Sequence, residues 1–384
     1  MSNTFHPTLP QNRIKLLDVF RGLAMVGVLL SNIVILSGYV FTPFVDLDNM
    51  HLAKLNSILN IVSMVIIKGK FYPMLMILFG AGLYMQFQKS DRDGFLKFFS
   101  WRMFLLLLIG LLHQTFWAGD VVTVYALFAF LLIPVRNLKP KNYLVIAVLL
   151  LILHFIASYI QTHFFAPAPV AGQEHIAGFQ LPGVLPNELI AAVQNEGIKG
   201  LRLITGKQSE FLWTIPRYIR ITPSTIMLFV LGAYLFGSGF FTEKVHKLKY
   251  LLMFLGIGIA GSFLMFNFSY SFSIIGNLFI ALAYMSLVAL LMTTVKGNRV
   301  FSLLAPLGRM ALTNYIMQSV ICITIFYGVG LGFFGKLPLY MVYLIAIVIL
   351  VFQILFSKYW LQKFQFGPLE MLWRKLSYGK AYRK

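Results

Sequence analysis

Long apolar stretches recur along the whole chain, and their length decides what the chain can fold into. A helix needs about 20 mainly apolar residues to cross a lipid bilayer. Ten stretches are of that kind, at about 16–40, 71–88, 98–117, 120–135, 142–165, 221–241, 250–269, 273–294, 303–328 and 338–361. Of the 384 residues only 11% are charged, against about 25% in a soluble domain. The sequence therefore predicts one integral membrane domain, an all-α bundle of about ten transmembrane helices.

The net charge of +20 is explained by where the lysines and arginines lie relative to these stretches. They flank alternate connections, such as 89–97, 136–141 and 244–249, as the positive-inside rule predicts for cytoplasmic loops. Both termini then lie in the cytoplasm, including a basic tail at about 363–384. The hydrophilic segment at about 166–215 lies on the other side, as a lid over an external mouth or as a tolerated insertion. Nucleic acid is not needed to explain the charge.

The start of the second span is predicted from a proline. Residues 56–67 read as an amphipathic helix, and Lys68 and Lys70 then precede Pro73, which suits a first helical turn. We therefore expect this span to begin near Phe71, with both lysines outside the membrane.

The first apolar stretch carries Asp18, Arg21 and Asn32. At 100° per residue, these three fall within about 60° of one another on a helix surface and form one polar stripe. A charge in the hydrocarbon layer costs about 2.5–3.5 kcal/mol, which makes an intramembrane arginine a candidate functional residue. Asp18 and Arg21 are also three residues apart, so they can simply neutralise each other at the membrane edge.

Other polar residues lie at matching depths in the predicted spans. From the helical rise, Arg21 and Arg309 both lie about 8–9 Å below the cytoplasmic boundary, whereas Asn32 and His113 lie in the outer half and Asn314 lies between. These residues describe a polar path across the membrane if their helices face one another.

His113 precedes Asp120 by seven residues, so the carboxylate can orient the imidazole. A neutral histidine held in this way is a usual general base for a hydroxyl or an amine. The structural alternative is a histidine bonded to a backbone carbonyl at the membrane interface.

The run LGRMALTNYIMQS at 307–319 is rich in small and amide residues. Asn314 and Gln318 are i,i+4 neighbours that either bond to other helices or, with Asp18, line a substrate path. The sequence lacks the closely spaced histidine pairs that are typical of metal sites. Cys322 is its single cysteine. Nucleotide-hydrolase and serine-hydrolase motifs are absent from the sequence.

Five segments, in chain order, carry a family resemblance: LLDVFRGLAMVGVLLSN, KFYPMLMILFGAGLYMQ, LLLIGLLHQTFWAGDVVTVYAL, LGRMALTNYIMQS and FGPLEMLWRKLSYGK. They closely resemble the YeiB-like family of bacterial membrane proteins, long grouped as a domain of unknown function. The resemblance covers nearly the whole chain. It implies a multi-pass protein of the bacterial cytoplasmic (inner) membrane and brings no settled activity with it.

More distantly, DVFRG and the following Asn32 are similar to the opening span of transmembrane acyltransferases, including heparan-α-glucosaminide N-acetyltransferase and the acyltransferase-3 enzymes. In such enzymes a cytoplasmic acyl-CoA donor serves an acceptor on the other side, with an asparagine and a histidine at the reaction centre. Asn32 matches the asparagine. The interval from Ile33 to Thr42 holds no histidine, so His51 or His113 would have to supply it.

The resemblance and the polar path together suggest an acyltransferase-like protein. Arg21 and Arg309 would bind the phosphates of an acyl-CoA donor such as acetyl-CoA, and His113, oriented by Asp120, would activate the acceptor while Asn32 stabilises the oxyanion. The expected partners are membrane lipids, a small-molecule or glycan acceptor, and a second copy in a homodimer. The alternatives are a transporter or flippase that uses the same path, and a scaffold or sensor without turnover.

Overall fold

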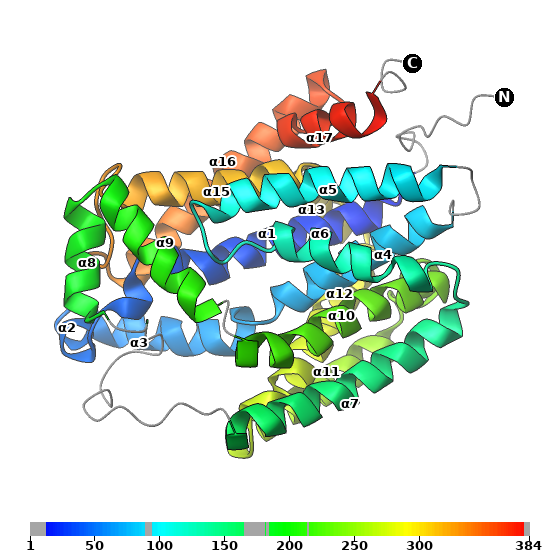
Figure 1. The fold of residues 1–384 in the computed structure, drawn as a ribbon, viewed down its shortest axis with the longest axis horizontal. Helices are drawn as coiled ribbons and strands as arrows, with labels where there is room; N and C mark the ends of the chain where they lie inside the picture. Colours follow the sequence, from blue (N-terminus) through cyan, green and yellow to red (C-terminus); the bar gives the residue numbers. More distant parts are fainter. Residues whose placement is uncertain (1–12, 89–93, 165–180, 182–183, 213–214, 380–384) are drawn as a thin grey trace.

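Helices joined by short connections make up the described part of the chain, which in this computed structural model is residues 13–88, 94–164, 181, 184–212 and 215–379 (Figure 1). The helices up to the middle of the chain are α1 (Lys15–Leu36), α2 (Phe44–Asp48), α3 (Ala53–Val62), α4 (Phe71–Phe87), α5 (Phe95–Gln114), α6 (Val122–Leu131), α7 (Pro140–Phe164), α8 (Pro186–Asn195) and α9 (Ile198–Leu212). The later helices are α10 (Ile215–Gly237), α11 (Leu248–Asn267), α12 (Ser273–Leu291), α13 (Val295–Phe301), α14 (Ala305–Arg309), α15 (Ala311–Phe326), α16 (Leu339–Lys363) and α17 (Pro368–Tyr378). None of these ranges contains a strand.

Seven helices in the described ranges are long and apolar enough to cross a membrane. An eighth span is possible if the helices before and after Met310, which meet at 81°, are counted as one broken span. The helix α6 and the apolar part of α10 (Thr222–Gly237) are shorter than a full span. The predicted all-α membrane bundle is thus confirmed, with seven or eight full-length spans where the sequence indicated about ten.

The helix α4 begins at Phe71, as predicted for the second span, but an apolar run precedes it within the same candidate span. The helices α3 and α4 form one apolar run, Ala53–Phe87, interrupted by a π-helical turn over Ser63–Ile67. Apolar side chains of α3 and of this turn, such as Ile61 and Val65, are more than half exposed. Lys68 and Lys70 therefore lie inside a candidate span and not beyond its end.

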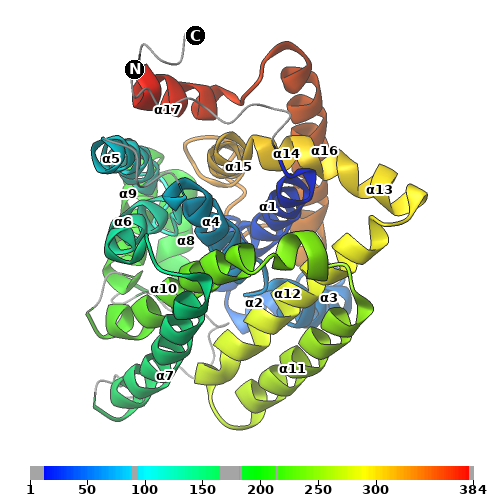
Figure 2. The same cartoon turned by 90° about the vertical axis from the view of Figure 1, so that its right-hand side faces the viewer.

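The first helix is the centre of the bundle (Figure 2). It packs against α4, α14, α15 and α16. Three pairs of closely packed helices surround this group: α5 with α6, α7 with α10, and α11 with α12. The first half of α1 belongs to one buried apolar cluster, and its second half belongs to another that includes α15 and α16.

The long hydrophilic segment is partly helical. The helices α8 and α9 cover the connection between α15 and α16, where the Gln194 amide donates to the Phe334 carbonyl at 2.5 Å and the Gly328 N–H donates to the Val193 carbonyl at 2.9 Å. Most of the earlier half of the segment, 165–180, lies outside the described residues. At the other end of the bundle, α17 lies across α5 and α15 (Figure 1).

Candidate functional site

Two glycines bring α1 and α14 into backbone contact. A Cβ on Gly22 would overlap the Leu304 carbonyl group, and a Cβ on Gly308 would overlap the Asp18 carbonyl oxygen. Small residues allow such close helix packing in membrane bundles. Arg21 and Arg309 directly adjoin these glycines in sequence, so this packing brings the two arginines to the wall of one cavity.

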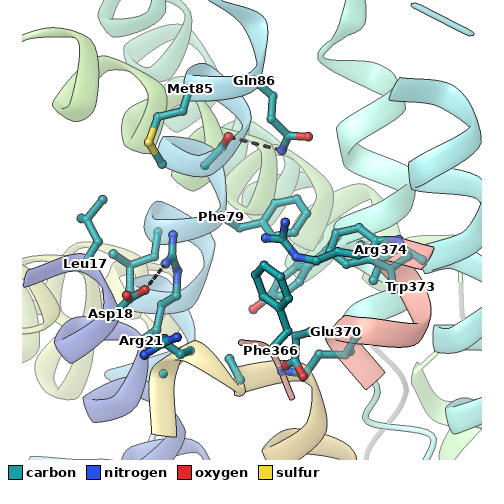
Figure 3. Close-up of a pocket in the computed structure, with 18 of the residues that line it drawn as sticks. Leu17, Asp18, Arg21, Phe79, Met85, Gln86, Phe366, Glu370, Trp373 and Arg374 are labelled. Carbon is teal, nitrogen blue, oxygen red and sulfur yellow. Dashed lines mark hydrogen bonds and ion pairs between the residues drawn. The ribbon is translucent and has the colours of Figure 1, made fainter. Parts of the chain in front are cut away.

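This cavity, which we call the arginine pocket, has a volume of about 400 Å³. Its walls come from α1, α4, α5, α6, the α14–α15 junction and α17, together with the segments that precede α1 and α17. Figure 3 shows Asp18 and Arg21 on one side of the pocket and Phe366, Glu370 and Arg374 on the opposite side.

The charged side chains of the pocket carry an excess of positive charge. Five arginines line it, and the acidic lining residues are two: Asp18 and Glu370. The arginines are Arg13, Arg21, Arg102, Arg309 and Arg374. Five positive and two negative charges leave a formal excess of three, which favours an anionic ligand.

The partners of these arginines leave donors available. Arg21 pairs with Asp18 at 2.8 Å and remains 29% exposed. Arg309 donates from Nη2 to the Gln365 carbonyl at 3.1 Å, and Arg102 donates from Nη1 to the Tyr378 hydroxyl at 3.0 Å. The Nε atoms of Arg102 and Arg309 are buried and have no hydrogen-bond partner among the described residues.

An aromatic side chain joins the two ends of the described chain. The guanidinium groups of Arg13 and Arg374 lie 5.1 and 4.1 Å from the ring centroid of Phe366, within the range of cation–π attraction. Burial lowers the pKa of Arg13 below its ordinary value, Asp18 opposes this shift, and the neighbouring arginines Arg309 and Arg21 add to it.

The inner wall of the pocket is apolar. Side chains from five helices form it, namely Met25, Leu75, Leu78, Phe79, Leu106, Val122, Tyr125 and Tyr315. The pocket thus has a cationic part and an apolar part, which suits an amphipathic anion.

The last helix closes one side of the pocket. The Glu370 carboxylate accepts the backbone N–H groups of Leu312 and Thr313, at 2.8 and 3.1 Å, and the Thr313 hydroxyl at 2.5 Å. It therefore caps the N-terminus of α15, whose first N–H groups have no partner within the helix. Burial raises the pKa of Glu370, and these hydrogen bonds partly offset the rise.

A second contact fixes α17 to α5. The Trp373 indole donates to the Arg102 carbonyl at 2.9 Å, and the Arg102 guanidinium stacks 4.0 Å from the Trp373 ring centroid. Arg102 is thus held by aromatic residues of α17 on one side of the pocket.

His113 and Asp120 form a buried pair at the C-terminal end of α5. The Nδ1 atom of His113 lies 2.7 Å from Oδ1 of Asp120, and Oδ2 accepts the Thr123 N–H at 2.7 Å. The carboxylate therefore orients the imidazole and caps α6 at the same time. Nε2 of His113 is buried and has no hydrogen-bond partner among the described residues.

Tyr315 lies between this pair and the pocket. Its ring packs edge-on against His113 at 5.1 Å, and its hydroxyl accepts the Val121 N–H at 3.2 Å. Because Tyr315 and Val121 both line the pocket, the apolar end of the pocket is separated from His113 by one side chain.

The sequence-predicted residues thus fall into three groups. Asp18, Arg21 and Arg309 share the lining of the arginine pocket, and His113 with Asp120 lies directly behind it. Asn32, Asn314 and Gln318 are outside the lining.

The two amides of α15 bond to other helices. Asn314 donates to the Ser357 hydroxyl at 2.9 Å, Gln318 donates to the Gln353 amide oxygen at 3.0 Å and to the Met25 carbonyl, and Gln353 donates to the Asn314 carbonyl. These bonds connect α15 with α1 and α16. Asn32 is partly buried on α1, about 17 Å beyond Arg21 along the helix axis.

Four charged residues of the lining were not predicted as site residues: Arg13, Arg102, Arg374 and Glu370. Arg102 had a usable signal, since it falls within the predicted span 98–117, where a charged side chain is costly. Glu370 also had one, because it is the single acidic residue in the basic C-terminal tail. No group of three potential metal ligands occurs among the described residues.

Helices of membrane-spanning length around an internal, charge-lined pocket define this chain as a helical integral membrane protein. Residues 235–380 match the family described as "Protein of unknown function (DUF418)". The chain is similar to the uncharacterized protein YxaH of Bacillus subtilis (strain 168), with 30% identity over 398 residues, covering 98% of this chain and 97% of the relative. It is also similar to the uncharacterized protein YeiB of Escherichia coli (strain K12), with 27% identity over 404 residues and 95% and 96% coverage. The chain belongs to this YeiB-like family of unknown function.

Proposed function

We propose that this protein is a membrane-embedded acyltransferase of the bacterial cytoplasmic membrane, which moves an acyl group from an acyl-CoA donor to an extracytoplasmic or lipid-linked acceptor. One observation carries the proposal. A single cavity has five arginines in its wall and an apolar end at Tyr315, and the His113–Asp120 pair packs on the other side of that tyrosine.

The arginines suit the phosphates of the donor. A guanidinium group presents a planar set of donors that matches phosphate oxygens, and charge-assisted bonds of this kind are about twice as strong as neutral ones. Arg21 and Arg309 would bind these phosphates together with Arg102, whose buried Nε adds a donor. The apolar wall would hold the thioester arm and the acyl chain.

His113 would act as the general base. If its Nδ1–H donates to Asp120, Nε2 is left to accept a proton from the hydroxyl or amine of the acceptor. The acceptor then attacks the thioester carbon, the C–S bond breaks, and the proton passes to the departing CoA thiolate. The new product bond is an ester or an amide.

Binding of labelled acetyl-CoA to the purified protein tests the donor assignment. We expect Arg21→Ala and Arg309→Ala each to weaken binding about 10- to 100-fold, since a bond between charged groups contributes about 1.5–3 kcal/mol. Lys15→Ala is the matched control, because Lys15 is a nearby cation outside the lining. Absence of acetyl-CoA binding, or an unchanged affinity in Arg21→Ala, would refute the assignment.

The base is tested separately. His113→Asn should retain donor binding and lose acyl transfer, because it removes the proton acceptor and leaves the arginines in place.

A transporter or flippase is the second candidate, and the 81° break next to Arg309 favours it. Transporters often bind their substrates where a membrane helix is broken. Substrate-dependent uptake into proteoliposomes that persists in His113→Ala would support this candidate over the acyltransferase.

A further inference from the structure

A second cationic site lies at the junction of α3 and α4, away from the arginine pocket. Lys68 and Lys70 follow the π-helical turn of Ser63–Ile67 and precede α4. Both fall within the candidate span Ala53–Phe87. Charged side chains inside a span are costly and usually mark a site where an ion or a ligand binds.

Contacts with neighbouring spans fix the level of the two lysines. The ring of Phe71, which follows Lys70, packs on Gly27, about 18 Å from the start of α1. The amide of Asn277, which is the fifth residue of α12, would lie 2.5 Å from a Cβ on Gly69. The lysines therefore lie between the middle of α1 and the first turns of α12, beyond the apolar end of the arginine pocket, which Met25 and Leu75 line.

The protein provides neutral partners for both ammonium groups. Lys70, which is 5% exposed, donates to the Met64 carbonyl at 2.9 Å. Lys68 donates to the Asn60 side-chain oxygen at 3.2 Å. The ion pairs of the described residues are Arg21–Asp18, His113–Asp120 and Lys207–Glu210, so neither lysine has a carboxylate partner in this part of the chain.

Two neighbouring cationic side chains without a carboxylate partner favour the binding of an anion. The N-terminus of α4 begins at Phe71 and adds a partial positive charge at the same place. The C-terminal carbonyls of the preceding turn offset part of this charge, and one of them already accepts Lys70. Lys68 and the first turn of α4 remain without a compensating charge.

The site is open toward the lipid. Gly69 is exposed and adopts a φ of +81°, which a residue with a side chain adopts only with strain. The nearby apolar residues Met64, Val65 and Ile66 are 42%, 56% and 49% exposed, as expected for a surface in contact with acyl chains. The Tyr284 hydroxyl of α12 donates to the Ile66 carbonyl and holds the turn in place.

We propose that Lys68, Lys70 and the first turn of α4 bind the phosphate group of an anionic phospholipid that enters laterally from the bilayer. The phosphate supplies the missing negative charge, and the exposed apolar residues of the π-helical turn contact its acyl chains. The site does not depend on the proposed acyl transfer, since it shares no residue with the arginine pocket.

The experiment compares the full-length protein in nanodiscs of phosphatidylglycerol or of phosphatidylcholine. Native mass spectrometry counts retained lipids, and thermal unfolding gives the midpoint in each lipid. We expect the wild type to retain at least one phosphatidylglycerol and to have a higher midpoint in that lipid. The double variant Lys68→Met/Lys70→Met should lose both properties, whereas Lys54→Met, which changes an exposed lysine of α3, should keep them.

Three outcomes would overturn the proposal. The double variant could retain phosphatidylglycerol as the wild type does. Its midpoint could fall equally in both lipids, which is the result expected if the lysines only cap the turn that ends α3. Inorganic phosphate added to phosphatidylcholine nanodiscs could reproduce the higher midpoint, which would assign the site to a soluble anion.

Discussion

Replacing Gly308 by alanine should separate α14 from α1. The added Cβ would overlap the Asp18 carbonyl oxygen and lie 2.6 Å from the Gly22 nitrogen. An ordinary contact between such atoms is about 3.4 Å, so α14 would have to move by about 0.8 Å or more. Neither obstructing group is a flexible side chain; both belong to the backbone of α1.

Overpacking of this kind costs about 1–3 kcal/mol. Alanine stabilises a helix by about 0.5–1 kcal/mol relative to glycine, so the free energy of unfolding should fall by about 1–2 kcal/mol in total. The same displacement moves Arg309 relative to Arg21, so ligand affinity at the arginine pocket should fall as well. The assay is thermal unfolding in detergent, together with anion binding by the same samples.

The matched control is Gly256→Ala on α11, where nothing lies within 4 Å of the added Cβ. This variant should be neutral or slightly more stable, since the helix preference acts without a clash. Equal midpoints for Gly308→Ala and Gly256→Ala would refute the claim that the two glycines set the helix separation.

Three further results are expected. Burial raises the pKa of Glu370 above its ordinary value. The stabilising contribution of the protonated group is therefore complete below the ordinary pKa and is lost as pH rises through the raised pKa. Glu370→Gln should remove this fall, so that the unfolding midpoint depends less on pH above the ordinary pKa of a glutamate; parallel pH profiles for the variant and the wild type would contradict this. Gln318→Leu leaves the Gln353 amide oxygen without its donor. The free energy of unfolding should therefore fall by about 0.5–1.5 kcal/mol, while ligand binding at the arginine pocket stays unchanged. Lost binding at an unchanged free energy of unfolding would instead place Gln318 in a ligand path. Arg102→Lys removes the stacking of the guanidinium group on Trp373. Amide hydrogen exchange in α17 should therefore accelerate. An unchanged exchange rate would show that other contacts hold this helix.

The helical class and most spans could be predicted because apolar length is a local property of the sequence. The matching depth of Arg21 and Arg309 was also predictable, since it follows from the helical rise along two separate spans. The cavity that Arg21 and Arg309 share could not be predicted, because it depends on which helices pack together. That packing rests on a contact between Gly22 and Gly308, which are 286 positions apart in the sequence.

The misplacement of Lys68 and Lys70 has a local cause. Two lysines around a glycine before a proline resemble the end of a loop, and the sequence alone does not show that a π-helical turn extends α3 to Ile67 directly before them. Contacts from distant helices stabilise that turn: the Tyr284 hydroxyl bonds the Ile66 carbonyl, and the Tyr343 hydroxyl bonds Ser63 at 2.7 Å. Such contacts leave no pattern in the segment itself.

The position of Phe366 between Arg13 and Arg374 has a consequence for biogenesis. The pocket takes one wall from residues that precede α1 and another from α17, which follows every candidate span of the described residues. During synthesis the cluster of arginines therefore stays incomplete until α17 has been made. A chain that terminates before α17 would keep its candidate spans but lack the wall formed by Glu370, Trp373 and Arg374.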